Sequence, residues 1–224
     1  MTRNDTREEM LELMRALVIY RAGEVRPQLT KVVEAASMLH LDSLLVTYHF
    51  AKFATGHVLE IGAFLGGSTI AAALGIRASG EAKKFISIEP GGQLKKHRLA
   101  SKDIFRDLKK NLARFGVSDL VTLLQGHSFD EAILARVQET FGLGSVGLFM
   151  FDADDNPARD FAVYGELLAD GCFVTVDDYV AGAEEKVGPT RAQVDALVAE
   201  GRLEPLGYYG WGTWVGRWRR KLPE

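Results

Sequence analysis

The sequence predicts an α/β protein with a Rossmann-like, doubly wound sheet, and two observations support this prediction. An apolar run over residues 58–61 stops at Gly62, and a helical pattern begins at Ser68, so a buried strand enters a helix through a glycine-bearing turn. Three later apolar runs alternate with helical segments, and each run ends in acidic residues: Glu89, Asp152, and the pair Asp177 and Asp178. Such alternation is typical of sheets that bind ligands at the carboxyl ends of their strands.

The turn after the first strand narrows the choice of ligand. Gly62 and Gly67 stand where a dinucleotide fingerprint has its first and last glycines, but Phe64 takes the middle position. The middle glycine lets the backbone approach a pyrophosphate, and a phenylalanine obstructs that approach while offering an apolar plate. The turn therefore favours a nucleoside without a diphosphate, such as S-adenosylmethionine, over NAD.

Length and composition predict one large α/β domain over residues 56–224, preceded by an N-terminal helical extension over residues 1–55. The 224 residues are 47% hydrophobic and 25% charged, and the net charge of −3 disfavours a nucleic acid partner. The charged N-terminus and the lack of an apolar run of about 20 residues predict a soluble, cytoplasmic protein without a membrane partner. The single cysteine, Cys172, excludes an internal disulfide.

The first 55 residues contain three helical patterns. Apolar residues recur at helical spacing before Pro27 and again after it, and a third helix is predicted over residues 41–53. We expect these amphipathic helices to cover the core. The alternative is that they close over an active site or pair with a second subunit in a homodimer.

The second and third strands are predicted to carry ligand-binding residues at their ends. Residues 84–89 end in Glu89, and a carboxylate at that edge accepts hydrogen bonds from both hydroxyls of a ribose. Residues 120–124 form the third strand, and a helix is predicted over residues 128–141 with Ser128 as its cap.

The fourth and fifth strands end in carboxylates. One predicted helix over residues 157–168 joins the strands at 146–152 and 172–178, so a right-handed crossover makes them neighbours. Carboxylates that lie close together oppose one another's ionisation unless a cation compensates them, and oxygen ligands alone suit Mg²⁺, Mn²⁺ or Ca²⁺. The alternative is that these acids cap helices or form solvated turns without a metal. The three carboxylates in question belong to Asp152, Asp177 and Asp178.

The first motif carries a family resemblance. The segment Glu60-Ile-Gly62-Ala-Phe64-Leu-Gly66-Gly67-Ser68 resembles that of class I S-adenosylmethionine-dependent methyltransferases, and most closely the metal-dependent catechol O-methyltransferase-like branch. The resemblance continues from about residue 58 to residue 179. It implies a seven-stranded sheet of order 3-2-1-4-5-7-6 with an antiparallel last strand.

The resemblance also assigns roles to single residues. It places the methionine end of the donor on Glu60, Gly62, Phe64, Gly66 and Ser68. It places the ribose on Glu89 and the adenine on Gly126, His127 and Ser128. It places a magnesium ion on Asp152, Asp177 and Asp178, the last of which replaces the asparagine of the family.

One departure from the family concerns the general base. Bacterial members of the branch have Asp-Ala-Asp-Lys after the fourth strand, whereas this chain has Asp155 in place of the lysine. Either Asp155 removes the acceptor proton alongside Asp152, or a metal-bound hydroxyl is acidic enough without a dedicated base, or the acceptor is not a catechol. A related branch, which includes macrolide-sugar O-methyltransferases and cephalosporin hydroxylase-like proteins, also carries acids at these strand ends.

The C-terminal third is predicted to complete the sheet. Residues 180–188 form a polar connection, residues 190–200 a helix, and the following segments a hairpin around residues 207–210. Trp211 and Trp214 either line an acceptor site or are buried on a sheet face.

The sequence thus predicts a divalent-metal-assisted O-methyltransferase that uses S-adenosylmethionine and acts on the hydroxyl of a small molecule. A nicotinamide-dependent oxidoreductase is one alternative, which Phe64 disfavours. A donor-binding protein without turnover is the other, which the missing lysine favours.

Overall fold

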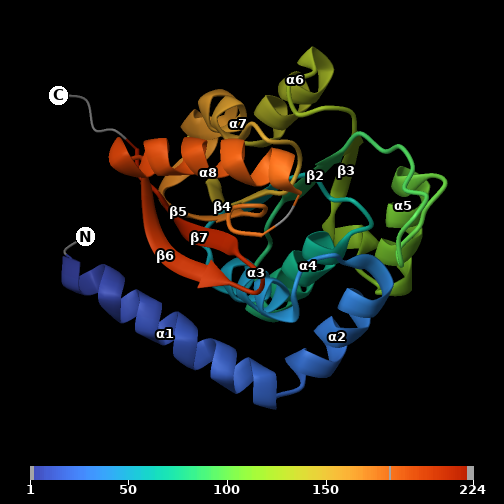
Figure 1. Cartoon of the computed structure of the whole chain (residues 1–224), viewed down its shortest axis with the longest axis horizontal. Coiled ribbons are helices and arrows are strands. Elements are labelled where there is room, and N and C mark those ends of the chain that lie inside the picture. The colour runs from blue at the N-terminus through green and yellow to red at the C-terminus, as the bar shows by residue number, and fades with distance from the viewer. Residues whose placement is uncertain (1–2, 182, 221–224) are drawn as a thin grey trace.

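A seven-stranded sheet forms the centre of the protein in a computed structural model that describes residues 3–181 and 183–220. The strand order is β3-β2-β1-β4-β5-β7-β6, and β7 runs antiparallel to both of its neighbours (Figure 1). The predicted fold class and strand order are confirmed. The strands are β1 (His57–Ile61), β2 (Phe85–Glu89), β3 (Thr122–Gln125), β4 (Val146–Phe151), β5 (Leu168–Val176), β6 (Leu203–Tyr209) and β7 (Thr213–Trp218).

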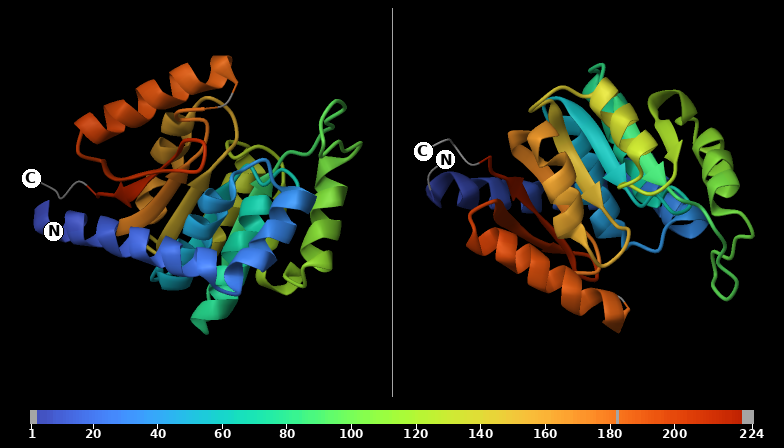
Figure 2. Two further views of the ribbon diagram at one scale, coloured as in Figure 1. Left: turned by 60° about the horizontal axis from the view of Figure 1, so that its bottom comes forward. Right: turned by 90° about the horizontal axis from the view of Figure 1, so that it is seen from above.

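Helices cover both faces of the sheet (Figure 2). On one face lie α1 (Arg3–Ala22), α2 (Val25–Ala36), α3 (Leu41–Phe53), α4 (Gly67–Ser79) and α5 (Ile104–Arg114). On the other face lie α6 (Glu131–Thr140), α7 (Pro157–Tyr164) and α8 (Glu184–Ala199). Two short 3₁₀ helices span Ser118–Leu120 and Gly165–Leu167.

The protein has two hydrophobic cores, one on each face of the sheet, and successive side chains of β1 point alternately into them. Val58 packs into the core under α1–α5, whereas its neighbour Leu59 packs into the core under α6–α8. Successive strand residues point to opposite faces, so a fully apolar strand supplies both layers. Leu13 and Leu29 of the N-terminal helices belong to the same core as Val58, and the domain boundary between residues 55 and 56 stays a prediction.

The carboxyl ends of β4 and β5 meet, as the crossover argument predicts, and β1 lies on the other side of β4. Strands β4 and β5 are parallel neighbours, with Phe151 opposite Val176. The Asp152 amide donates to the Ile61 carbonyl at 2.9 Å, and the Asp177 amide donates to the Phe151 carbonyl at 3.0 Å. These two hydrogen bonds fix both aspartates at one edge of the sheet.

Several predicted element boundaries are wrong. The helix predicted over residues 157–168 ends at Tyr164, β5 begins at Leu168 rather than at residue 172, and β3 begins at Thr122 rather than at residue 120. Helix α6 begins at Glu131 rather than at residue 128, because the Asp130 carboxylate accepts a hydrogen bond from the His127 amide at 2.7 Å and holds an extra turn. Helix α8 begins at Glu184 rather than at residue 190, with Pro189 inside it. The hairpin turn follows Tyr209, because Gly207 lies at a bulge within β6 instead of in the turn.

None of the helices in the described ranges combines the length and the apolar character that crossing a membrane requires.

Candidate active site

A pocket of about 420 Å³ opens at the carboxyl ends of β1, β2, β3 and β4, and we call it the donor pocket. Ligands of open α/β sheets bind at this edge. Seven of the nine residues predicted to bind the donor line it: Gly62, Phe64, Ser68, Glu89, Gly126, His127 and Ser128. The last residue of α2 and the connection to α3 close one side of it: Ala36, Ser37, Met38 and Leu39.

The turn between β1 and α4 brings the backbone into the donor pocket. Gly62 has a φ of +88°, Phe64 of +49° and Gly66 of +96°, which are left-handed values that favour glycine. A Cβ atom at Gly62 would overlap the carbonyl oxygen of Asp152. Gly66 precedes the first residue of α4 and is not among the residues that line the pocket. The left-handed backbone of the turn, rather than contact with a ligand, favours glycine at this position.

Glu60 supports the turn from inside the core. Its carboxylate is almost fully buried and accepts hydrogen bonds from the hydroxyls of Ser68 at 2.5 Å, Thr69 at 2.6 Å and Ser87 at 2.6 Å. Burial raises the pKa of Glu60 to about 6 despite these three donors. Glu60 is not among the residues that line the donor pocket, so its geometry is that of a brace for the first turn of α4.

This brace gives a prediction about stability and pH. Folding raises the pKa of Glu60 from 4.5 to about 6, so between these values the folded state binds more protons than the unfolded state and stability falls as pH rises. From pH 4.5 to neutral pH, we expect the wild-type protein to lose about 2 kcal/mol more unfolding free energy than Glu60→Gln. Urea unfolding at the two pH values measures the difference. Glu200→Gln, at an exposed position, is the control, and equal losses in all three proteins would contradict the prediction.

Glu89 faces the donor pocket from the end of β2. Its two carboxylate oxygens accept hydrogen bonds from the backbone amides of Phe64 at 2.7 Å and Gly91 at 2.8 Å. Burial raises the pKa of Glu89, and the amide donors oppose that rise by stabilising the charged form. The carboxylate is therefore held in one orientation at the rim of the pocket.

The segment after β3 forms the far wall of the donor pocket. The Gly126 amide donates to the Glu89 carbonyl at 3.2 Å, which ties this segment to the end of β2. The Ser128 side chain is buried, and its carbonyl oxygen accepts a hydrogen bond from the Tyr164 hydroxyl. The exposed His127 ring stacks on Phe129, with centroids 5.1 Å apart.

Two of the three carboxylates predicted at this edge of the sheet border the same cavity. Asp152 lines the donor pocket and shares a second, much smaller cavity with Asp177. Burial raises the pKa of Asp152 well above its usual value, and repulsion from Asp177 and Asp178 raises it further. Burial also raises the pKa of Asp177, while the Thr213 hydroxyl, which donates to it at 2.6 Å, opposes that rise.

A lysine that the sequence analysis did not single out lies at this edge. The Lys186 ammonium donates to the Ala153 carbonyl at 2.6 Å and lies 3.4 Å from a carboxylate oxygen of Asp178. No three His, Cys, Asp or Glu side chains in the described part of the chain are arranged to hold a metal ion. With an ammonium at Asp178 and a hydroxyl on Asp177, the residues present do not fit the expected magnesium ion, whose site stays a prediction.

Asp155, the second predicted catalytic residue, lies apart from the donor pocket. The Asp155 side chain is exposed and is not among the residues that line the pocket. Its neighbour Asp154 does line the pocket. Asp154 forms an ion pair with Arg159 at 2.7 Å, and Arg159 also lines the pocket. The sequence offered no signal for this pair, because Arg159 reaches the site from α7.

Neither tryptophan lines the donor pocket. Trp214 is buried in the sheet, which is the alternative that its position in an apolar strand favours. Trp211 is 65% exposed at the hairpin turn and lies 5.3 Å from the His40 ring, measured between centroids.

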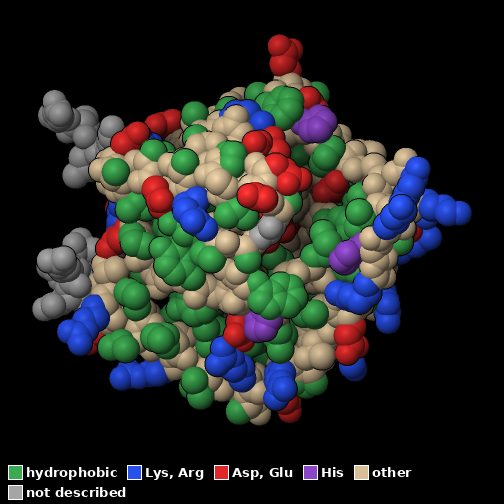
Figure 3. Space-filling view, in the orientation of Figure 1, with side chains coloured by type: hydrophobic (Ala, Val, Ile, Leu, Met, Phe, Trp, Pro, Cys, Tyr) green, Lys and Arg blue, Asp and Glu red, His purple; other side chains and the backbone are tan. Residues whose placement is uncertain are grey.

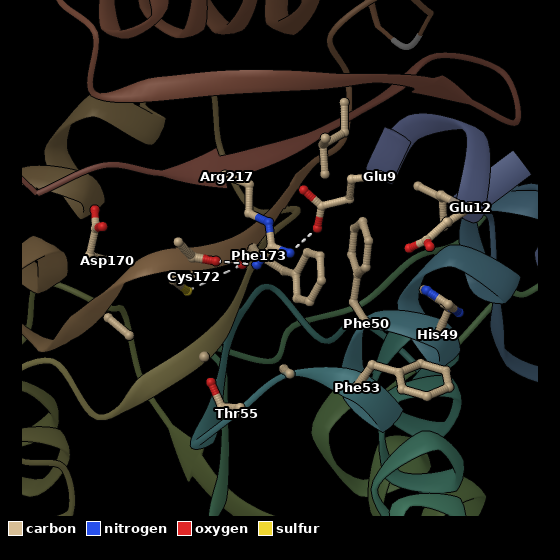
Figure 4. A pocket seen from close by; sticks show the side chains of 16 residues that line it. Glu9, Glu12, His49, Phe50, Phe53, Thr55, Asp170, Cys172, Phe173 and Arg217 are labelled. Atoms are coloured by element: carbon tan, nitrogen blue, oxygen red, sulfur yellow. Dashed lines mark hydrogen bonds and ion pairs between the residues drawn. The ribbon is translucent and has the colours of Figure 1, made fainter. Parts of the chain in front are cut away.

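A second large cavity, of about 450 Å³, lies at the opposite edge of the sheet (Figure 4). Glu9 of α1 and Arg217 of β7 form an ion pair inside it, and the Arg217 guanidinium lies 3.6 Å from the centre of the Phe173 ring. Burial lowers the pKa of Arg217 to about 10. This cavity has a volume similar to that of the donor pocket, but it faces the amino ends of the parallel strands. Ligands of open α/β sheets bind at the carboxyl ends, so the donor pocket remains the candidate site.

Comparison with solved structures shows that the fold is shared with O-methyltransferases. The chain is 18% identical to cofactor-bound Rv0187 from MTB, with a TM-score of 0.65 over 92% of this chain and 96% of that one. It is 17% identical to the O-methyltransferase TomG of Streptomyces achromogenes, solved in complex with SAM, with a TM-score of 0.62 over 91% and 95% of the two chains. It is 18% identical to a Bacillus cereus O-methyltransferase in complex with SAH, with a TM-score of 0.57 over 98% and 93%.

Comparison of sequences identifies the family. No curated protein matches the chain. A family model described as a methyltransferase domain matches residues 59–179, which is more than half of the chain and includes both the glycine turn and the carboxylates. The chain therefore belongs to this methyltransferase family and has the class I fold of the S-adenosylmethionine-dependent enzymes.

Proposed function

We propose that the protein transfers a methyl group from S-adenosylmethionine to the hydroxyl oxygen of a small molecule. The observation that carries this proposal is the Glu89 carboxylate, which two backbone amides hold at the rim of a pocket of nucleoside size. In this proposal Glu89 accepts the ribose hydroxyls, Ser128 and the backbone around Gly126 and His127 hold the adenine, and the glycine turn holds the methionine end. Structures of TomG with SAM and of the Bacillus cereus enzyme with SAH support the choice of donor.

The nicotinamide alternative receives no support from the site. A pyrophosphate needs free backbone amides in the glycine turn. Here the Phe64 amide already donates to Glu89, and the Phe64 side chain lines the pocket.

The transfer step needs an acceptor oxygen in line with the methyl carbon. The oxygen attacks the methyl carbon, the carbon–sulfur bond breaks with its electron pair going to sulfur, and the hydroxyl proton leaves to a base. We assign that base to the Asp152 carboxylate, because Asp152 borders both the donor pocket and the small cavity beside it, whereas Asp155 lies outside the pocket. Positive charge on sulfur is lost in the step, so the site need not stabilise a new ion.

The family resemblance adds a divalent ion, and that finer proposal has a specific difficulty. A magnesium ion on Asp152, Asp177 and Asp178 would orient the acceptor oxygens and make the hydroxyl more acidic. The Lys186 ammonium beside Asp178 opposes it. The steps proposed above therefore run through protein side chains alone.

A small acceptor also suits the charge on the face of the molecule that Figure 3 shows. In Figure 3, hydrophobic side chains gather in the middle of the face shown, and Lys and Arg side chains of the described residues lie mostly toward its edges. A nucleic acid ligand would require a continuous basic surface. The cytoplasmic location stays a prediction of the sequence.

The homodimer through the N-terminal helices also remains a proposal. Exposed apolar side chains of α1 lie at helical spacing and support it: Leu11, Met14 and Val18. Sedimentation analysis of the wild-type protein and of Met14→Glu would test it, since a dimer that uses this face should dissociate when a charge enters it.

Replacing Asp152 tests the proposed chemistry. We expect Asp152→Asn to lower kcat by about 100-fold or more, because an amide cannot accept the hydroxyl proton, while the affinity for S-adenosylhomocysteine changes little. Transfer of labelled methyl to a panel of phenols, catechols and sugars measures turnover, and calorimetry measures affinity.

Asp155→Asn is the matched control, with expected turnover near that of the wild-type protein. The reverse result, with Asp155→Asn inactive and Asp152→Asn active, would contradict the assignment. A wild-type protein that binds S-adenosylhomocysteine but methylates nothing would instead favour a donor-binding protein without turnover, and binding of NAD alone would favour the oxidoreductase.

A further inference from the structure

The Lys186 side chain bridges the two loops that a shared metal ion would bridge. Its ammonium donates to the carbonyl of Ala153, which follows β4, and lies 3.4 Å from the carboxylate of Asp178, which follows β5. The Lys186 side chain also lines the donor pocket. One protein cation is thus placed between the carboxylate edge and the space where donor and acceptor must meet.

The position of Lys186 is not explained by helix formation. Lys186 lies in the first turn of α8, where the helix dipole disfavours a positive charge and favours acids such as Glu184 and Glu185. A cation at that position therefore needs a compensating partner outside the helix. Asp178 and the Ala153 carbonyl are the partners that the structure provides.

Asp178 lies in a left-handed turn directly after β5. Its φ is +54°, a conformation that is uncommon for residues with a side chain and that aspartate adopts more readily than most. The side chain stays only partly exposed and meets the ammonium. A divalent ion bound to Asp178 would lie within a few ångströms of Lys186, where like charges repel strongly.

The donor count leaves at least one N–H for a ligand. An ammonium has three donors and no acceptor. One N–H donates to the Ala153 carbonyl, the ion pair with Asp178 at 3.4 Å occupies at most one more, and the side chain borders the donor pocket. At least one N–H is therefore left for an acceptor oxygen in that pocket.

We propose that the Lys186 ammonium is the cation of the acceptor site and takes the place of a divalent metal ion: it balances Asp178, excludes the metal and donates a hydrogen bond to the acceptor oxygen. This inference rests on the proposed methyltransferase function. It makes methyl transfer by this chain independent of divalent ions, in contrast to the metal-dependent branch that its first motif resembles.

Metal binding tests the proposal without knowledge of the acceptor. With Mn²⁺ as the probe, we expect electron paramagnetic resonance to show no saturable site in the wild-type protein up to about 1 mM. Lys186→Met removes the competing charge, and we expect its Mn²⁺ affinity to rise about tenfold or more. Lys186→Arg keeps the charge and should behave like the wild-type protein, and Lys95→Met, which removes an exposed lysine elsewhere, should do the same.

A double variant locates any site that is gained. In Asp178→Gly/Lys186→Met, the side chain freed by the lysine is gone and glycine tolerates the left-handed backbone at this position, so the gain in Mn²⁺ affinity should be lost. Saturable Mn²⁺ binding by the wild-type protein that matches Lys186→Met would overturn the proposal, because the ammonium would then exclude nothing. Absence of Mn²⁺ binding in both proteins would overturn it as well, because something other than Lys186 would exclude the ion.

Donor affinity separates failure of this inference from failure of the proposed function. S-adenosylhomocysteine should bind the wild-type protein and Lys186→Met with the same affinity within about threefold, which also shows that the variant is folded. If the wild-type protein does not bind S-adenosylhomocysteine, the methyltransferase proposal itself fails. If both bind it and the Mn²⁺ results go against the expectation, only the role of Lys186 fails.

Discussion

Replacing Gly62 with alanine is expected to lower the free energy of unfolding by about 3 kcal/mol or more. The φ of +88° is strained for alanine, and the new Cβ would overlap the backbone oxygen of Asp152. That oxygen cannot move away easily, because the Asp152 amide is hydrogen-bonded to Ile61 on the neighbouring strand. Urea unfolding followed by circular dichroism measures the loss, and donor binding should fall with it.

Gly80→Ala is the matched control for this variant. Gly80 also has a left-handed backbone, with a φ of +71°, but a Cβ there would meet nothing within 4 Å. We expect it to cost only the conformational penalty of about 1 kcal/mol. Equal losses for Gly62→Ala and Gly80→Ala would show that the contact between the glycine turn and the end of β4 has no energetic importance.

Replacing Glu89 with alanine is expected to weaken the binding of S-adenosylhomocysteine by about 100-fold or more. Hydrogen bonds to a charged group contribute about 1.5–3 kcal/mol, and the proposed ribose contact contains two of them. The substitution also releases the amides of Phe64 and Gly91, so the glycine turn loses its anchor. Calorimetry at fixed pH measures the affinity.

Glu89→Gln separates the two contributions. Glutamine keeps one acceptor oxygen and its size but loses the charge, so we expect an affinity between those of the wild-type protein and Glu89→Ala. If Glu89→Ala bound S-adenosylhomocysteine as tightly as the wild-type protein does, the ribose assignment would be wrong.

The fold was predictable because its signals are local. Each strand is a short apolar run, and the run from Val146 ends in the acid Asp152 and is followed by a helix, so the crossover rule could place it beside β5 without tertiary information. The glycine turn was predictable for the same reason. The boundary errors at Ser128 and Gly207 arose where a side-chain hydrogen bond or a bulge, rather than composition, sets the end of the element.

The site was predictable only where its residues lie at strand ends. Glu89 and Asp152 were predictable because parallel strands place their carboxyl ends, where these two residues lie, at the ligand-binding edge of the sheet. The role of Glu60 as a brace depends on hydroxyls from α4 and β2. These hydroxyls meet Glu60 only in the folded tertiary structure, so the sequence pattern could not predict the role. Lys186 escaped notice because Gly188 and Pro189 predict a loop where the structure continues a helix, and its partner Asp178 lies on another segment.

The antiparallel hairpin at the edge of the sheet bears on how the protein matures during synthesis. Every residue that lines the donor pocket precedes Thr213 in the chain, whereas the hydroxyl that holds Asp177 belongs to Thr213 itself. Strands β6 and β7 also supply buried residues to both cores: Leu206 and Val215 to one, and Trp214 and Trp218 to the other. A ribosome-bound chain that ends before β7 therefore lacks part of each core as well as the hydroxyl on Asp177. We expect the donor pocket to form only after the hairpin has left the ribosome, so an unfinished polypeptide would not bind its methyl source.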